Sequence, residues 1–265
     1  MNDRLHDRVI LFTEAGEGDV YGRSWARAAA REGARLAIAD RTRTLAESLA
    51  EEVRSAGGEA IDLEIDVTDE ESCVRAAAVT IERFGRIDVL VNDAHLWLGL
   101  RRDDASRDYL HHVLDVNGLG AWAAARGVVP HMRRQGGGKI INLSSIGAWV
   151  DSPVYAAHVE RTGNLPTFGY ALSRVLANGL TRFMARALGP SGITVNALAI
   201  GMILSEGTKR QLDESERQAF VDRTALRRIL EIRDTDGAFL FLASADSDLV
   251  TGQIIVVDGG LVMLG

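Results

Sequence analysis

The sequence predicts a single α/β domain over residues 1–265, built on a doubly wound parallel sheet of about seven strands with helices on both faces. Short, nearly continuous apolar runs alternate with longer segments of helical period along the chain. Strands that are covered by helices on both faces require such apolar runs. The chain also has no internal repeat and only 4 prolines in 265 residues, so the sequence shows no linker between domains.

The expected strands and helices follow one another in regular order. Strands are expected at Val9–Phe12, Arg35–Ala39, Ala60–Ile65, Val89–Val91, Lys139–Leu143, Thr194–Ala199 and Gln253–Val257. Helices are expected at Arg23–Glu32, Thr42–Ala56, Glu70–Phe84, Ser106–Arg134, Tyr170–Leu188, Glu214–Ile229 and Thr235–Leu242. Right-handed crossovers between such units give a Rossmann-like sheet.

Two stretches interrupt this rhythm. Residues 149–169 stand where a short connection between strand and helix is expected, and residues 202–223 follow the sixth strand. Long connections of this kind often act as lids. We therefore expect an insertion at 149–169 and a lid at 202–223, both over a substrate pocket.

The composition excludes several classes of protein. A formal net charge of −7 argues against a general binder of nucleic acid or anionic membranes, because both need a basic surface. The single cysteine, Cys73, excludes an internal disulfide framework. No apolar run is long enough to span a bilayer, and the first residues lack the apolar core of a signal peptide. We therefore expect a cytoplasmic protein. We also expect no metal site, because the adjacent His111 and His112 point to different helix faces.

The first expected strand is followed by a turn that contains Gly16, Gly18 and Gly22 and leads into a helix. Glycines at such a turn let the backbone approach a pyrophosphate that rests on the helix N-terminus. Any tight turn also favours glycine, so the turn alone is weak evidence. The second strand ends at Asp40, whose carboxylate can accept hydrogen bonds from ribose hydroxyls and repels a 2′-phosphate. NAD is therefore favoured over NADP, although Arg41 weakens the preference.

Further motifs follow in chain order. Asp66 and Val67 end the third strand, where they can bind an adenine edge. The later motifs are Asn92-Asp-Ala94-His95, Val116-Asn117, Ile141-Asn-Leu-Ser-Ser145, Tyr170-Ala-Leu-Ser-Arg174, Val195-Asn-Ala-Leu-Ala-Ile-Gly201 and Thr251-Gly-Gln-Ile-Ile-Val-Val-Asp-Gly-Gly260. Over nearly the whole chain, the sequence resembles the short-chain dehydrogenase/reductases. The resemblance implies hydride transfer between a nicotinamide and a secondary alcohol or ketone, in a homotetramer or dimer.

The resemblance also implies a catalytic set of Asn117, Ser145, Tyr170 and Arg174. In the family, the tyrosine exchanges the substrate proton, the serine holds the substrate oxygen, a cation favours the tyrosinate, and the asparagine anchors a water. Ser144 is an alternative to Ser145. Tyr155 is an alternative to Tyr170, but it has no cation four residues later. The implied cofactor-binding residues are Gly16, Gly18, Gly22, Asp40, Asp66, Val67, Asn92, Ala94, Tyr170, Arg174, Gly201, Ile203 and Ser205.

Several residues depart from the family pattern. Arg174 replaces the usual lysine, Glu14 replaces the first turn glycine, His95 replaces another glycine, and Ile200 replaces a proline. A carboxylate about 4 Å from a phosphate charge costs roughly 4 kcal/mol at an effective dielectric constant near 20. Either Glu14 points at ribose hydroxyls or at solvent, or the pyrophosphate does not bind. His95 either crowds the cofactor or is a loop histidine in water.

These departures leave two alternatives to an NAD(H)-dependent oxidoreductase. One is a lyase similar to the halohydrin dehalogenases, which use a Ser-Tyr-Arg set without a nucleotide. The retained Asp40, Asp66 and Asn117 argue for nucleotide use and against this alternative. The other is a non-catalytic relative that acts as a binding subunit. For an enzyme, the apolar residues of the two lid segments favour a modestly apolar alcohol or ketone as the substrate.

Overall fold

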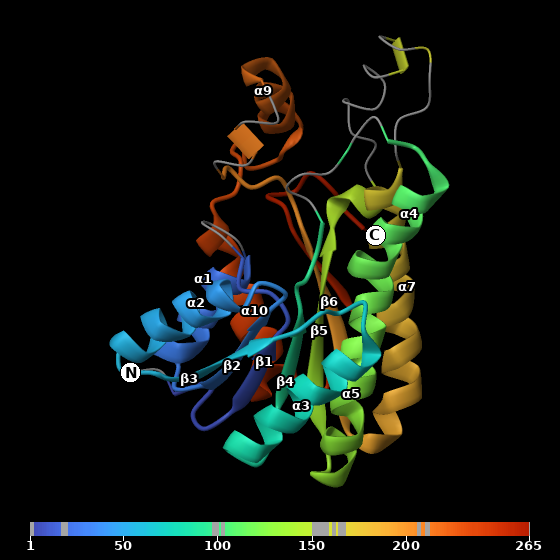
Figure 1. Ribbon diagram of the computed structural model, residues 1–265. Coiled ribbons are helices and arrows are strands. Elements are labelled where there is room, and N and C mark those ends of the chain that lie inside the picture. Colours follow the sequence, from blue (N-terminus) through green and yellow to red (C-terminus); the bar gives the residue numbers. More distant parts are fainter. Residues whose placement is uncertain are drawn as a thin grey trace.

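The computed structural model describes residues 3–16, 21–96, 101, 104–149, 159–160, 163, 168–205, 208–209 and 213–264. Within these residues, seven strands form one sheet in the order β3-β2-β1-β4-β5-β6-β7, and every neighbouring pair is parallel (Figure 1). The strands are β1 (Val9–Phe12), β2 (Arg35–Asp40), β3 (Glu59–Glu64), β4 (Val89–Asn92), β5 (Gly138–Ser145), β6 (Ile193–Ile200) and β7 (Ile254–Val257). The predicted fold class is confirmed.

Helices cover both faces of the sheet (Figure 1). One face carries α1 (Tyr21–Arg31), α2 (Arg43–Ser55) and α10 (Asp236–Ala243). The other carries α3 (Glu70–Phe84), α5 (Gly120–Arg134) and α7 (Gly169–Leu188), with α4 (Arg107–Leu114) beside α7. No helix among the described residues is long and apolar enough to cross a membrane.

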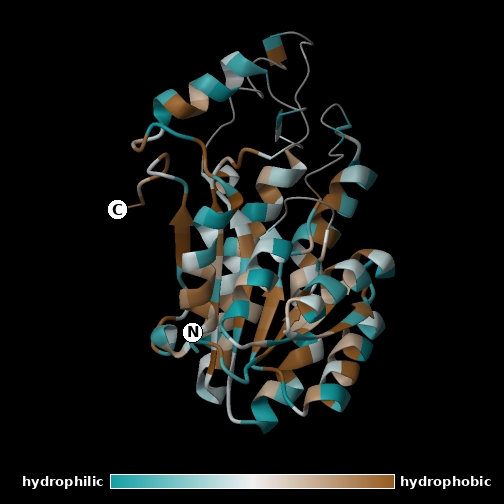
Figure 2. Ribbon diagram, turned by 90° about the vertical axis from the view of Figure 1, so that its left-hand side faces the viewer, coloured by the Kyte–Doolittle hydropathy of each residue, from teal (hydrophilic) through white to brown (hydrophobic). Residues whose placement is uncertain are grey.

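The alternation of side chains along β1 gives each face its own core. Ile10 and Phe12 pack with the α1, α2 and α10 side, where the Trp25 ring stacks on Phe239 at 5.2 Å between centroids. Val9 and Leu11 pack on the opposite side against α3, α5 and α7. Apolar strands therefore lie between helices whose outer faces are polar, as Figure 2 shows.

Most expected elements are present with ends shifted by one or two residues, and α3 has the expected bounds. Its sequence carries both end signals, because the Asp69 side chain accepts from the Glu71 N–H and Gly85 adopts the left-handed conformation at φ 79°. The helix expected over Ser106–Arg134 is interrupted by a π-helical turn at Asp115–Leu119. Sequence periodicity does not reveal such a turn.

The helix expected over Glu214–Ile229 was predicted too long, because α9 ends at Arg223. The following residues leave the helix to bond with the C-terminal loop, where the Leu226 N–H donates to the Gly259 carbonyl at 3.0 Å. Arg227 takes a left-handed conformation at φ 52° in this segment. Within the lid expected at 202–223, α9 lies beyond the carboxyl ends of the strands (Figure 1). Most of the insertion expected at 149–169 lies outside the described residues.

Candidate active site

The predicted site residues come together at the carboxyl edge of the sheet. Asn92 closes β4, Ser145 closes β5, Asp40 closes β2, and Gly201 directly follows β6. Open parallel sheets bind their ligands at this edge. Of the residues predicted for the site, Gly18 lies outside the described residues, as does Tyr155, the alternative to Tyr170.

Tyr170 and Ser145 both lie next to Gly147. A Cβ built on Gly147 would be 3.5 Å from Ser145 Oγ and 3.6 Å from Tyr170 Cε1, and the Gly147 N–H donates to Ser145 Oγ at 3.1 Å. Ser144 is turned away, since its buried hydroxyl donates to Asn178 Oδ1 at 2.7 Å. This arrangement supports Ser145, rather than Ser144, as the serine that would hold a substrate oxygen.

Arg174 lies one helical turn after Tyr170 on α7, and its Cζ is 4.8 Å from the centre of the Tyr170 ring. The side chain is only 1% exposed, and Nη1 donates to the Leu143 carbonyl at 3.0 Å. Nε and Nη2 are buried without a hydrogen-bond partner among the described residues. A buried donor without a partner costs about 1–3 kcal/mol. These two N–H groups fit the hydroxyl oxygens of a cofactor ribose.

Asn117 lies in the π-helical turn and joins it to the start of α7. Its Oδ1 accepts from the Leu96 N–H at 2.6 Å, and its Nδ2 donates to Ser173 Oγ at 3.2 Å. The Ser173 hydroxyl in turn donates to the Tyr170 carbonyl at 2.6 Å. The π-helical turn therefore sets the position of Asn117 relative to Tyr170.

The turn after β1 is held by Asp40. Its Oδ2 accepts from the Ala15 and Gly16 N–H groups, both at 2.9 Å, and its Oδ1 accepts from the Thr42 N–H at 2.7 Å. Sequence reasoning gave Asp40 a role toward ribose only and missed this role in the turn. At the end of the turn, a Cβ on Gly22 would collide with Asp93 Oδ2 and the Glu14 carbonyl oxygen. Glycine is therefore required there.

Glu14 and His95 contact each other, which the sequence analysis did not foresee. Glu14 Oε2 lies 2.8 Å from His95 Nδ1, and the Glu14 side chain is 26% exposed. His95 is not a histidine in open water, since its side chain is 11% exposed and Nδ1 also lies 2.7 Å from the Asp93 carbonyl oxygen. The two residues that replace family glycines thus bind each other across 81 positions of sequence.

Asp93 is a buried carboxyl group beside this pair. Its Oδ1 accepts from the Thr13 N–H at 3.2 Å and the Glu14 N–H at 3.1 Å, which ties β4 to β1. Its Oδ2 is buried without a partner among the described residues. Burial raises the pKa of Asp93 well above its usual value, and the charge of Glu14 raises the pKa further.

We expect Asp93→Asn to stabilise the protein increasingly as pH rises. The folded-state pKa is raised, so the neutral acid stabilises the fold at low pH and this contribution is lost on deprotonation. The neutral amide keeps the accepting oxygen, so the free energy of unfolding of the variant should be about 1–3 kcal/mol higher than that of the natural protein at high pH. Thermal unfolding from about pH 4 upward measures the difference in Tm, which should be small at the acid end.

Asp88→Asn is the matched control for that prediction. Asp88 is also buried and directly precedes β4, but its Oδ2 accepts from the Val9 N–H at 2.9 Å and from Arg86 Nε at 2.8 Å. Loss of this paired carboxylate should lower the Tm at neutral pH. A lower Tm for Asp93→Asn at pH 8 would contradict the role given to burial.

Sequence reasoning did not assign a role to Tyr21, the first residue of α1. Its ring centre is 5.6 Å from Trp25 and 6.0 Å from His95. Burial raises the pKa of Tyr21, the nearby Tyr170 raises that pKa further, and Arg174 opposes the rise. Tyr21, at the end of the glycine turn, therefore lies close enough to Tyr170 and Arg174 for their charges to affect its pKa. Its position directly before Gly22, the last glycine of the turn, was the feature of the sequence that could have pointed to Tyr21.

The other predicted cofactor residues lie along the same edge. Asp66 Oδ1 accepts from the Thr68 hydroxyl at 2.6 Å, and this hydrogen bond lowers the pKa of Asp66. Asn92 Nδ2 donates to Asn142 Oδ1 at 2.9 Å, and Asn92 Oδ1 has no partner among the described residues. Val67 and Ala94 lie shortly after the ends of β3 and β4. A Cβ on Gly201 would lie 2.7 Å from the Asp258 Cβ. Ile203 forms a β-bridge with Leu230, and the Thr208 N–H donates to Ser205 Oγ.

Comparison with known proteins identifies the family. A family model described as enoyl-(acyl carrier protein) reductase matches residues 21–262. The chain belongs to the short-chain dehydrogenase/reductase family. Members of this family are oxidoreductases that use nicotinamide cofactors, so the chain is an enzyme of that class.

Two curated short-chain dehydrogenase/reductases illustrate the range of the family. A 7alpha-hydroxysteroid dehydrogenase of Bacteroides fragilis is 33% identical over 98% of this chain and 96% of its own length. A 3-oxoacyl-[acyl-carrier-protein] reductase of Thermotoga maritima is 33% identical over 98% of this chain and all of its own length (100%). The two relatives have different substrates, so family membership does not identify the substrate here.

Two solved structures of the family resemble the whole chain. A gluconate 5-dehydrogenase of Burkholderia cenocepacia, in complex with NADP and tartrate, has a TM-score of 0.86 and 32% identity, and covers 98% of this chain and 97% of its own. A 7α-hydroxysteroid dehydrogenase in complex with NADH and 7-oxo glycochenodeoxycholic acid has a TM-score of 0.86 and 30% identity, with coverages of 98% and 96%. One of these short-chain dehydrogenase/reductases thus holds NADP, and the other holds NADH.

Proposed function

We propose that the protein is an NAD(H)-dependent oxidoreductase that interconverts a secondary alcohol and a ketone. The observation that carries this proposal is the grouping of Ser145 and Tyr170 around Gly147, with Arg174 against the Tyr170 ring. A hydroxyl that holds an oxygen, a phenol that exchanges its proton and a cation beside the phenol are the groups that carbonyl reduction requires. The catalytic residues are then Asn117, Ser145, Tyr170 and Arg174.

The residues present fit a nicotinamide dinucleotide. The two unpartnered N–H groups of Arg174 would bind ribose hydroxyls, and the amino end of α1 has no acidic side chain in its first turn to oppose a phosphate. Asp40 would lie at the other ribose, and Asp66 with Val67 at the base. Glu14 is held by His95, which reduces the repulsion that its charge would exert on a pyrophosphate.

In this mechanism the bound nicotinamide supplies or takes up the hydride. Tyr170 gives its phenolic proton to the substrate oxygen during reduction and takes that proton back during oxidation. Ser145 donates a hydrogen bond to the same oxygen and fixes its position. The Arg174 guanidinium stabilises the phenolate that remains on Tyr170, because opposite charges attract strongly in a buried site. Asn117 holds the start of α7 and would anchor a water of the proton relay.

The substrate, the assembly and the location are part of the same proposal. The apolar residues of the segments 149–169 and 202–223 favour a modestly apolar alcohol or ketone, which these segments would cover as insertion and lid. Family resemblance supports a homotetramer or dimer. The acidic composition and the single cysteine support a cytoplasmic location.

Titration with NADH and NADPH tests the proposal. We expect NADH to bind with a Kd in the micromolar range and at least about tenfold more tightly than NADPH, because the Asp40 charge repels a 2′-phosphate. Asp40→Asn should narrow that ratio, and Arg182→Gln, an exposed charge change on α7, should leave it unchanged. Nucleotide fluorescence and tryptophan quenching measure both constants.

Failure to bind either nucleotide at millimolar concentration would overturn the proposal. Halide release from a halohydrin would then decide whether the Ser-Tyr-Arg group catalyses epoxide formation without a nucleotide. Equal affinity for the two nucleotides would refute the role of Asp40 alone and leave the reaction class standing.

A further inference from the structure

A cavity lies at the edge of the sheet opposite the candidate active site, at the amino ends of the strands. Its volume is about 360 Å³, within the range of small-molecule sites. Arg8 directly precedes β1, Asp88 directly precedes β4, Lys139 is the second residue of β5, and Thr194 is the second residue of β6. Four adjacent strands therefore contribute to one cavity, on the side away from Tyr170.

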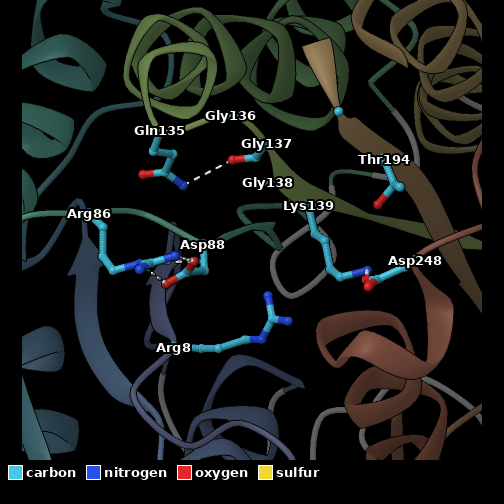
Figure 3. A pocket seen from close by; sticks show the side chains of 11 residues that line it. Arg8, Arg86, Asp88, Gln135, Gly136, Gly137, Gly138, Lys139, Thr194 and Asp248 are labelled. Atoms are coloured by element: carbon cyan, nitrogen blue, oxygen red, sulfur yellow. Dashed lines mark hydrogen bonds and ion pairs between the residues drawn. The ribbon is translucent and has the colours of Figure 1, made fainter. Parts of the chain in front are cut away.

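Two ion pairs stand on either side of this cavity. Arg86 Nε donates to Asp88 Oδ2 at 2.8 Å, and Lys139 Nζ lies 2.8 Å from Asp248 Oδ1. Figure 3 shows Arg8 extending between these pairs with its guanidinium toward the middle of the cavity. Each pair is neutral as a whole, so the cavity carries about one net positive charge.

Arg8 is the source of that charge, and its guanidinium has no hydrogen-bond or ion-pair partner among the described residues. The buried hydroxyl of Thr194 is also without a partner in the described part of the chain. Lys139 is only 5% exposed through its side chain and is held by Ser247 Oγ at 3.2 Å. The cavity thus combines a free cation, a fixed cation and an unused hydroxyl in an acidic protein.

One wall of the cavity is formed by closely packed glycines. A Cβ on Gly137 would lie 2.8 Å from the Gly192 carbonyl oxygen, and a Cβ on Gly192 would lie 2.8 Å from the Gly136 carbonyl oxygen. Both glycines have positive φ angles, 157° and 70°. Side chains are therefore absent from this wall. The residues that line the cavity include no apolar side chain, which favours a hydroxylated ligand over an apolar one.

We propose that this cavity is a binding site for a small, hydroxylated organic anion, whose carboxylate or phosphate group pairs with Arg8. Guanidinium groups bind both oxyanions through two parallel hydrogen bonds. Lys139 and Thr194 provide further donors from β5 and β6. A ligand there would join the starts of four strands and stabilise the fold. The site is separate from the proposed nucleotide site, and the proposal does not depend on the enzymatic one.

Calorimetric titration of the full chain with L-malate and with glycerol 3-phosphate, at constant ionic strength in sodium chloride, tests this proposal. We expect saturable binding of at least one probe in the millimolar range or tighter, and none of uncharged glycerol. Binding of malate alone identifies a carboxylate site, and binding of glycerol 3-phosphate alone identifies a phosphate site. Tyr170→Phe and saturating NADH should leave the Kd unchanged.

Variants locate the binding. Arg8→Gln should weaken the Kd at least tenfold, whereas Arg75→Gln, a charge change at a 63% exposed residue of α3, should leave it unchanged. Thr194→Val keeps the side-chain shape and should weaken the Kd severalfold, so the test remains if Arg8→Gln folds poorly. Absence of binding of both probes to the natural chain, or equal binding by Arg8→Gln, overturns the proposal.

Discussion

Replacing Tyr170 by phenylalanine is expected to lower turnover by about 10²–10⁴-fold, the usual contribution of a positioned acid or base. The ring would keep its contacts with Arg174 and Gly147, so stability and nucleotide affinity should change little. Steady-state kinetics together with NADH titration separate these effects, because the loss should fall on kcat. Unchanged kcat in a folded variant would remove Tyr170 from the mechanism.

Tyr155→Phe and Tyr21→Phe are the matched controls for this experiment. Both remove one phenolic oxygen, and both are expected to keep kcat within about tenfold of the natural enzyme, a change of 1.4 kcal/mol or less in the barrier. Loss of activity in Tyr155→Phe alone would show that the tyrosine had been assigned wrongly.

Replacing Arg174 has opposite expected effects on activity and stability. Arg174→Met removes the cation beside Tyr170 and should lower kcat about 10²-fold or more. The same change removes two buried N–H groups that have no partner in the described part of the chain, so the Tm without ligand should rise. Stability that opposes function in this way is typical of ligand-binding residues.

Arg174→Lys restores the cation with different geometry. The ammonium is a point charge that can bind two ribose hydroxyls, whereas the guanidinium is planar. We expect turnover equal to or above that of the natural enzyme with NADH. In a dehalogenase, the same change should impair halide release instead. A fall in Tm for Arg174→Met would contradict the interpretation that the Nε and Nη2 groups of Arg174 are ligand-binding donors.

The fold was predictable because its signals are local. Apolar runs identified every strand of the sheet, and Asp69 and Gly85 identified the ends of α3. Errors arose where distant contacts override the local pattern. The periodicity of residues 214–229 favours one helix, but Leu226 bonds to Gly259 instead. The π-helical turn at Asp115–Leu119 lies between two helices whose apolar residues have helical spacing. The sequence therefore gives no sign of the interruption.

The candidate site was predictable in its membership more than in its contacts. Motifs placed Ser145, Tyr170 and Arg174 at one edge of the sheet, but no local rule could pair Glu14 with His95 across 81 positions. For the same reason, the bonds from Asp40 to Ala15 and Gly16 were not foreseen. Charge arithmetic at Glu14 predicted a repulsion toward a bound phosphate and did not foresee the contact with His95.

The contact between Glu14 and His95 makes these two positions a single unit of change. Glycine at position 14 alone leaves the His95 imidazole with only the Asp93 carbonyl oxygen. Glycine at position 95 alone leaves the Glu14 carboxylate beside the glycine turn without the imidazole, whereas two glycines together remove both side chains. The effects of the separate substitutions should therefore not add, as is usual for residues in direct contact. Any attempt to restore the family turn in this enzyme has to alter both residues in one step.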